Sequence, residues 1–168
     1  MRTLFLISIA ILLFTVGCKK EDEWQTVSIT GNYINTPDLA AGFFTLTLPD
    51  GSVLQAPKQY IVSGSDNVVG TIDATKSVLT VESITPSTKF FGFDLVYHIV
   101  MYNSDGDQVH FDGTAQSYTD FTGIGWVHYT EGTGKFEGIS GWENFTLTTD
   151  PTTGIHTIVA TGEATYKK

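Results

Sequence analysis

Phe90–Asp112, FFGFDLVYHIVMYNSDGDQVHFD, carries the clearest indication of the fold. Residues of high β propensity fill both ends, and the turn residues Asn103-Ser104-Asp105-Gly106-Asp107 separate them. An Asp-Gly pair between two such runs is a strong hairpin signal, because glycine adopts the positive φ that a tight bulged turn requires. The stretch therefore predicts two antiparallel strands joined at Gly106.

The turn also predicts which residues of this hairpin lie opposite one another. If Asn103 faces Asp107, the register places Val100 opposite His110 and His98 opposite Asp112. Successive side chains point to opposite faces of a strand, so the hairpin has one apolar and one polar face. The apolar face carries Ile99, Met101, Val109 and Phe111, and the polar face carries His98, Tyr102, His110 and Asp112. On the next expected strand, Trp126, His128 and Thr130 share a face.

The same pattern continues outward along the chain. After Trp24 no window keeps apolar residues at helical spacing for three turns. Residues 48–52 and 150–154 form two further turns, and the first pairs Leu46 with Leu54 and Phe44 with Ala56. Residues 37–42 fit one helical turn and residues 117–120 a loop. The other expected strands are Val27–Thr36, Tyr60–Gly64, Val68–Asp73, Val78–Ser83, Phe90–Tyr102, Gln108–Gln116, Phe121–Thr130, Trp142–Thr148 and Ile155–Tyr166. Nine or ten strands without helices predict an all-β sandwich or barrel.

Length and charge exclude several classes of function. A chain of 168 residues fits one domain. Its 9 Lys and Arg against 18 Asp and Glu give a net charge of −9, which argues against a nucleic-acid partner. The single cysteine excludes an internal disulfide and a cysteine-rich zinc site.

The N-terminus has the pattern of an export signal. Leu4–Val16 is an apolar run of 13 residues, shorter than the roughly 20 that span a bilayer as a helix. Thr15-Val16-Gly17-Cys18 resembles the cleavage site of bacterial lipoprotein precursors, although Leu is commoner than Thr at the first position. The resemblance implies a signal peptide over 1–17, an acylated Cys18 with a tether over 18–25, and a barrel domain over 26–168. A plain signal peptide followed by a free cysteine is the alternative.

The tether carries an expectation about location. Lys19-Lys20-Glu21-Asp22-Glu23 is similar to the signal that sends Bacteroidetes lipoproteins to the outer face of the outer membrane. The resemblance implies a protein anchored in outer-membrane lipid through Cys18 and facing the exterior. A simple flexible tether is the alternative.

A second resemblance lies in the glycine-rich segment Gly132–Gly141, GTGKFEGISG, which follows an upstream Gly106-Asp107. It resembles a signature of small bacterial secreted proteins related to the allene oxide cyclase and dirigent barrels, within the calycin-like group. The resemblance implies a single antiparallel β-barrel of about eight to ten strands. Independently of the family, glycines allow a tight corner, with Phe136 plugging one end of the core. The corner glycines are Gly132, Gly134, Gly138 and Gly141. A simple glycine-rich hairpin is the alternative.

The sequence holds no recognisable catalytic motif. No Gly-x-Ser-x-Gly elbow is present, and the acidic residues are scattered over turns. His98, His110 and His128 together with an acid suggest zinc, but their spacing has no local ligand motif, so no metal is expected. We expect no catalytic residue and no cofactor.

These observations favour a monomer that binds a small apolar or amphipathic ligand without catalysis. The many aromatic side chains fill a barrel interior or line a cavity within it. The candidate ligand-binding residues are Tyr97, His98, His110, Trp126 and His128. One alternative is a structural or adhesive surface module with a solid interior. A more remote one is a cofactor-free isomerase that uses one of the three histidines as its acid–base group.

Overall fold

The computed structural model describes residues 23–48 and 50–167. The expected signal peptide, Cys18 and most of the tether lie outside these residues. The described strands are β1 (Trp24–Pro37), β2 (Phe43–Thr47), β3 (Val53–Pro57), β4 (Gln59–Asp66), β5 (Gly70–Thr71), β6 (Val78–Pro86), β7 (Gly92–Tyr102), β8 (Gln108–Tyr118), β9 (Thr122–Gly132), β10 (Ser140–Thr149) and β11 (His156–Lys167). Two single turns of 3-10 helix, η1 (Leu39–Ala41) and η2 (Gly134–Phe136), complete the fold. Within the described ranges no helix is both long and apolar enough to cross a bilayer.

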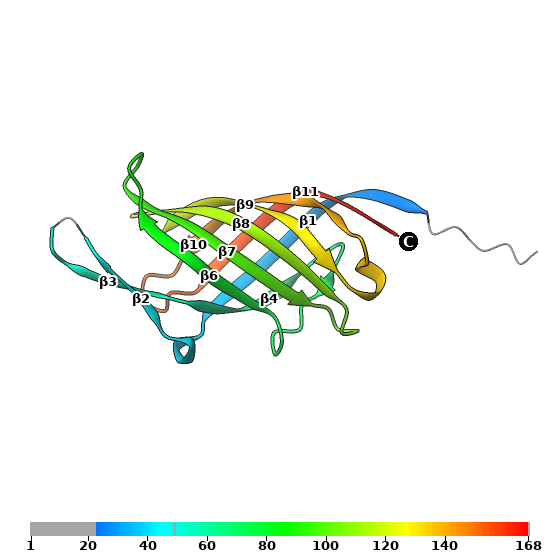
Figure 1. Cartoon of the computed structure of the whole chain (residues 1–168), viewed down its shortest axis with the longest axis horizontal. Coiled ribbons are helices and arrows are strands. Elements are labelled where there is room, and N and C mark those ends of the chain that lie inside the picture. The colour runs from blue at the N-terminus through cyan, green and yellow to red at the C-terminus, as the bar shows by residue number, and fades with distance from the viewer. Residues whose placement is uncertain (1–22, 49, 168) are drawn as a thin grey trace, which may run out of the picture.

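Eight antiparallel strands form a closed ring. Their order is β1-β11-β10-β9-β8-β7-β6-β4, and β4 pairs back onto β1 (Figure 1). The two-residue strand β5 pairs antiparallel with the end of β4, and β2 with β3 forms a separate hairpin that projects from one end of the barrel. Because the ring is closed, these eight strands have no open sheet edge and do not form two stacked layers. The prediction of a single antiparallel β-barrel is confirmed.

The predicted register of the hairpin joined at Gly106 is also confirmed. Val100 pairs with His110 and His98 with Asp112. Gly106 has a φ of 91°, as a tight bulged turn requires. The side-chain Oδ1 of Asn103 holds the turn by accepting from the backbone N–H groups of Asp105 and Asp107, both at 2.9 Å.

One expected strand, Val68–Asp73, shrinks to the two residues of β5. The cause is Asp66, whose Oδ1 accepts from the backbone N–H groups of Val68 and Val69, both at 2.6 Å. A carboxylate that caps two successive N–H groups bends the chain, so these residues form a turn in place of a ladder.

The glycine segment closes one end of the barrel. Phe136 is 0% exposed, and its ring meets that of Tyr166 at a centroid distance of 6.3 Å. Gly134, Gly138 and Gly141 have φ values of 57°, 75° and 138°, and a side chain on Gly134 would collide with the carboxylate of Asp107. Thr133 N donates to Gln108 O, and Gln108 N donates to Thr133 Oγ1, both at 2.9 Å. The segment is thus a folded cap fixed to the start of β8, not a simple hairpin.

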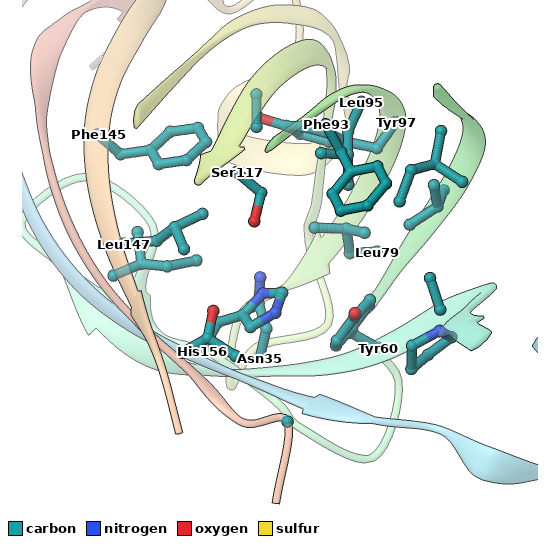
Figure 2. Close-up of a pocket in the computed structure, with 18 of the residues that line it drawn as sticks. Asn35, Tyr60, Leu79, Phe93, Leu95, Tyr97, Ser117, Phe145, Leu147 and His156 are labelled. Carbon is teal, nitrogen blue, oxygen red and sulfur yellow. The ribbon is translucent and has the colours of Figure 1, made fainter. Parts of the chain in front are cut away.

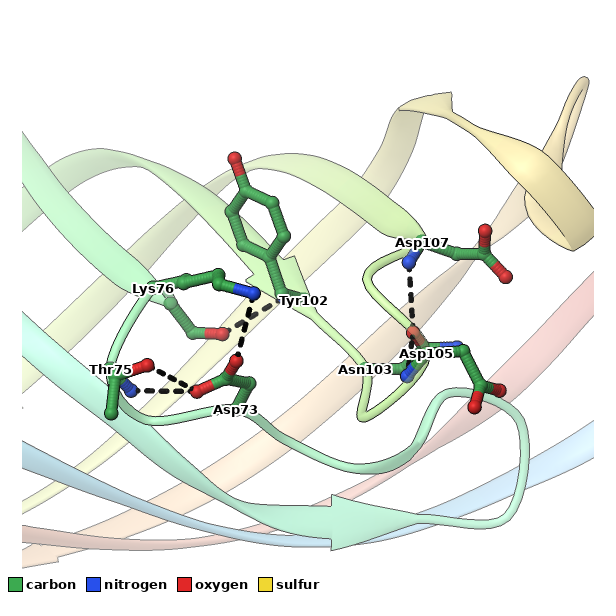
Figure 3. Close-up of polar contacts among 8 residues, drawn as sticks. Asp73, Thr75, Lys76, Tyr102, Asn103, Asp105 and Asp107 are labelled. Atoms are coloured by element: carbon green, nitrogen blue, oxygen red, sulfur yellow. Dashed lines mark hydrogen bonds and ion pairs between the residues drawn. The ribbon is translucent and has the colours of Figure 1, made fainter.

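A second turn reinforces this closed end (Figure 3). Asp73 Oδ1 accepts from Thr75 N at 3.0 Å and from Thr75 Oγ1 at 2.6 Å, and Lys76 Nζ lies 3.3 Å from Asp73 Oδ2. The backbone N–H of Asp73 donates to Tyr102 O at 2.8 Å, which ties the turn to the end of β7. Turns from both halves of the chain therefore support the sealed end.

Candidate functional site

The barrel encloses a cavity of about 400 Å³. Leu54 on β3, Phe121 in the β8–β9 loop and Pro151 in the β10–β11 loop line its outer part, so it opens at the end from which the β2–β3 hairpin projects. The volume lies within the roughly 300–1,000 Å³ of small-molecule sites. The sequence left open whether the interior is hollow or solid, and the structure shows that it is hollow.

The walls of the cavity are mostly apolar. Figure 2 shows Phe145 and Leu147 of β10 across the cavity from Phe93, Leu95 and Leu79. Tyr97 lines the same interior, with its ring centroid 6.4 Å from that of Phe145. Such walls favour a ligand that is itself mainly apolar.

Two carboxyl groups are buried inside the protein, and one of them lines the cavity. Glu143 on β10 is 2% exposed and lines the cavity, and Tyr129 Oη donates to its Oε1 at 2.9 Å. Tyr33 Oη lies 3.2 Å from Glu143 Oε2 and 2.9 Å from Asp66 Oδ2. Asp66 is also buried but does not line the cavity. We call Glu143, Asp66, Tyr33 and Tyr129 the acid cluster.

Counting protons assigns the charge states of the acid cluster. Asp66 accepts from two backbone N–H groups and from Tyr33, an environment that suits an ionised carboxylate. Tyr33 has one hydroxyl proton, so it cannot donate to both carboxyl groups at once. Every hydrogen bond of the acid cluster has one donor and one acceptor when Glu143 is protonated and donates from Oε2 to Tyr33 Oη.

Burial explains why Glu143 keeps this proton. Loss of solvation, followed by the charge of Asp66, raises the pKa of Glu143 to about 7, although the hydroxyl of Tyr129 acts in the opposite direction. Burial also raises the pKa of Asp66, against the opposing effect of its backbone donors. The same desolvation raises the pKa of Tyr33, Tyr97 and Tyr129, which therefore stay neutral.

The outer half of the cavity carries neutral polar groups. His156 packs on Tyr60 with ring centroids 4.7 Å apart, and Asn35 lies beside them (Figure 2). Burial lowers the pKa of His156 to about 4, so the imidazole is uncharged near neutral pH. Among the described residues that line the cavity there is no Lys or Arg, and the carboxyl groups are Glu143 and Asp150. In the described lining, the acids thus have no positively charged partner.

The candidate residues from the sequence divide between the two faces of the sheet. Tyr97 points inward and lines the cavity, whereas the next residue, His98, points outward and lies 2.6 Å from Asp112 through its Nδ1. His110 packs on His98 on the outer face, with ring centroids 5.6 Å apart. Trp126, which is 45% exposed, packs there on His128 at 5.1 Å.

The outward position of these four residues corrects two expectations. His98, His110, Trp126 and His128 do not line the cavity, so they are not ligand residues of this site. For the same reason none of the three histidines can serve as an acid–base group inside the barrel. In the described part of the chain, no group of three or more His, Cys, Asp or Glu is arranged to hold a metal ion.

Sequence reasoning missed the acid cluster. Glu143 could have been found, because it shares its strand face with Phe145 and Leu147, and a carboxyl group at an inward position of an apolar face is unusual. Asp66 carries no such signal, since an acid before Asn67 fits an ordinary turn.

Comparison with known proteins supports the fold alone. No protein-family model matches the chain, and no curated protein matches it in sequence. The solved structure of the pterocarpan synthase dirigent protein GePTS1 is similar, with a TM-score of 0.52 and 15% identity over 88% of this chain and 93% of that one. The pterocarpan synthase dirigent protein PsPTS1 gives a TM-score of 0.45 and 17% identity over 89% of this chain and 99% of that one. The likeness to GePTS1 agrees with the expected dirigent-like barrel.

Proposed function

We propose that this protein binds a small, mainly apolar ligand inside its barrel and does not transform it. The observation that carries the proposal is the cavity of about 400 Å³, with apolar walls and one open end. A dirigent-like fold supports it, because a barrel of eight strands is wide enough to hold one small ligand.

We also propose that the barrel is a lipoprotein domain anchored at the exterior of the outer membrane through Cys18. The support is the Thr15-Val16-Gly17-Cys18 pattern and the charged residues that follow it. β1 begins at the sealed end, where Trp24 pairs with Lys167. Residues 18–23 reach at most about 20 Å. In this arrangement the mouth of the cavity faces away from the membrane, and the ligand exchanges with the aqueous side.

Filling the cavity tests the binding function. We expect Leu147→Trp to weaken binding of the neutral apolar fluorophore N-phenyl-1-naphthylamine by about 10-fold or more, because the indole occupies the space between the walls. The measurement is a fluorescence titration of the chain from Lys19 onward, which contains every strand of the barrel.

Thr148→Trp is the matched control, because Thr148 is the next residue on β10 and is exposed. It should bind the fluorophore like the unmodified protein, and circular dichroism should show the same β spectrum for both variants. Absence of saturable binding to the unmodified protein, or unchanged binding by Leu147→Trp, would refute a ligand-binding cavity.

Acylation tests the anchor. Cells grown with an alkyne-tagged fatty acid should label the unmodified protein, whereas Cys18→Ala should carry no label because the acceptor thiol is gone. Thr15→Leu, which restores the commoner residue of the cleavage pattern, should be labelled as well as the unmodified chain. An unlabelled native protein would show a plain signal peptide instead.

The outer face supports one alternative function, that of an adhesive module. Four partly exposed apolar side chains lie on neighbouring strands β9, β10 and β11: Ile124, Trp126, Trp142 and Val159. A patch of this kind is typical of a surface that contacts another molecule. The fluorophore titration separates the two functions, because adhesion through this patch does not require an occupied cavity.

A further inference from the structure

We propose that the cavity selects ligands that carry a protonated amine, with the ammonium group held against Glu143 and the apolar part directed toward the mouth. This inference rests on the proposed binding function and specifies the chemical class of the ligand. Three features of the interior support it: an imbalance of charge, an aromatic lining and the depth at which Glu143 lies.

The described residues that line the cavity include carboxyl groups but no Lys or Arg to pair with them. The titratable groups that face Glu143 come from four strands: Tyr33 on β1, Asp66 on β4, Tyr97 on β7 and Tyr129 on β9. All four of these groups are acids, so none can carry a positive charge, and the three tyrosines are neutral. Glu143 keeps its proton in the empty barrel because an ionised carboxylate there would have no counter-charge. An ammonium ligand supplies that charge and so stabilises the ionised form of Glu143.

The aromatic rings suit the same ligand. Tyr97, Phe111 and Phe145 line the cavity, and their ring faces attract a desolvated cation. The hydrogen bonds of Tyr33 and Tyr129 keep the carboxyl group of Glu143 in a fixed position. A carboxyl group in a cavity that aromatic rings also line thus offers an ammonium group both a charge partner and cation–π contacts.

The same features exclude fatty acids and other anions. A carboxylate ligand would find no Lys or Arg among the described lining residues, and His156 is uncharged because it is buried. Lys58 lies outside the lining, with its Nζ 5.7 Å from the ring centroid of Phe44. Discrimination therefore arises from repulsion of anions as well as from attraction of cations.

The position of Glu143 on β10 sets the shape of the ligand. Glu143, Phe145, Leu147 and Thr149 all line the cavity and follow one another along β10 toward the loop at the mouth. The six residue steps from Glu143 to Thr149 span about 20 Å along the strand. A linear amine of roughly ten carbons, with its head at Glu143, therefore fits between the acid cluster and the mouth.

Binding of such an amine is coupled to a proton. The ligand enters as the ammonium ion, and below pH 7 Glu143 releases its proton to the solvent to form the ion pair. The affinity for the amine should therefore rise by about 10-fold per pH unit as the pH increases toward 7. The affinity for a neutral ligand of the same length should not follow this dependence.

Displacement of N-phenyl-1-naphthylamine by decylamine, 1-decanol and decanoate tests the inference. On the chain from Lys19 onward at pH 7.5, we expect decylamine to bind at least about 10-fold more tightly than decanol, and decanoate not to compete. The preference for decylamine over decanol should shrink at pH 5.5. In Glu143→Gln the ratio of the two affinities should fall to about 1.

The matched control is Glu163→Gln, because Glu163 is an exposed residue of the neighbouring strand, paired with Trp142. It should keep the full preference for the amine, and thermal unfolding should show that both variants are folded. Binding of the fluorophore and decanol without a preference for decylamine overturns the inference and leaves the binding function intact. A preference that survives in Glu143→Gln overturns the assignment to Glu143. Failure of the fluorophore to bind refutes the binding function itself.

Discussion

Replacing Phe136 with alanine is expected to lower the free energy of unfolding by about 3–5 kcal/mol. Phe136 is fully buried in the cap, where its backbone N–H donates to Thr133 O at 3.0 Å and its ring meets Tyr166. Truncation removes the plug of the sealed end and leaves a void between the cap and the strands. Urea unfolding followed by tryptophan fluorescence measures the loss.

Phe91→Ala provides the matched control, because the Phe91 side chain is 89% exposed. Loss of an exposed ring should change the free energy of unfolding by about 0.5 kcal/mol or less. A loss of less than about 1 kcal/mol for Phe136→Ala would show that the cap contributes little to the stability of the barrel.

The second large effect is expected in the pH dependence of stability, which Glu143 and His156 influence in opposite directions. Glu143 has its pKa raised from 4.5 to about 7 in the folded state. Between these values the folded protein holds a proton that the unfolded chain has lost, so the contribution of Glu143 is present below pH 4.5 and disappears as the pH rises through 7. The amount is on the order of 3 kcal/mol.

His156 acts in the reverse sense. Its pKa falls from 6.5 to about 4, so between these values the unfolded chain binds a proton that the folded protein does not. The contribution of His156 is therefore present above pH 6.5 and disappears as the pH falls through 4. It is the smaller of the two, because His156 keeps some contact with solvent whereas Glu143 is almost fully buried.

Two variants separate these contributions. Glu143→Gln should lose the stabilisation at low pH, so its free energy of unfolding should rise from pH 4.5 to 7 relative to the unmodified protein. His156→Gln should show the opposite difference. Urea unfolding at pH 4.5, 5.5, 6.5 and 7.5 checks both. A Glu143→Gln curve parallel to that of the unmodified protein would mean that Glu143 is ionised throughout this range.

The strands and their pairing could be predicted because turn chemistry is local. Asp105-Gly106 fixed the register of β7 and β8, and residues 48–52 fixed that of β2 and β3, where Leu46 pairs with Leu54 as expected. Each of these turns needs only four or five consecutive residues to specify it.

The acid cluster could not be predicted in the same way, because closure of the barrel assembles it. Tyr33 and Glu143 are 110 positions apart in the sequence, and Tyr33 and Asp66 are 33 apart. Asp66 meets Tyr33 only once β4 pairs back onto β1, and Glu143 reaches Tyr33 across the intervening strand β11. Strand alternation places Tyr97 and His98 on opposite faces of β7, but it does not tell which of the two faces points into the barrel.

The first strand of the barrel begins on the side where the last one ends, since Trp24 of β1 and Lys167 of β11 are paired partners. A short peptide could therefore join the two ends, and a cut at the solvent-exposed tip of the β2–β3 hairpin would create a circular permutant with an uninterrupted ring. In such a permutant new termini flank the opening, and a fluorescent reporter fused there would sense occupancy directly. The fold is thereby suited to conversion into a biosensor.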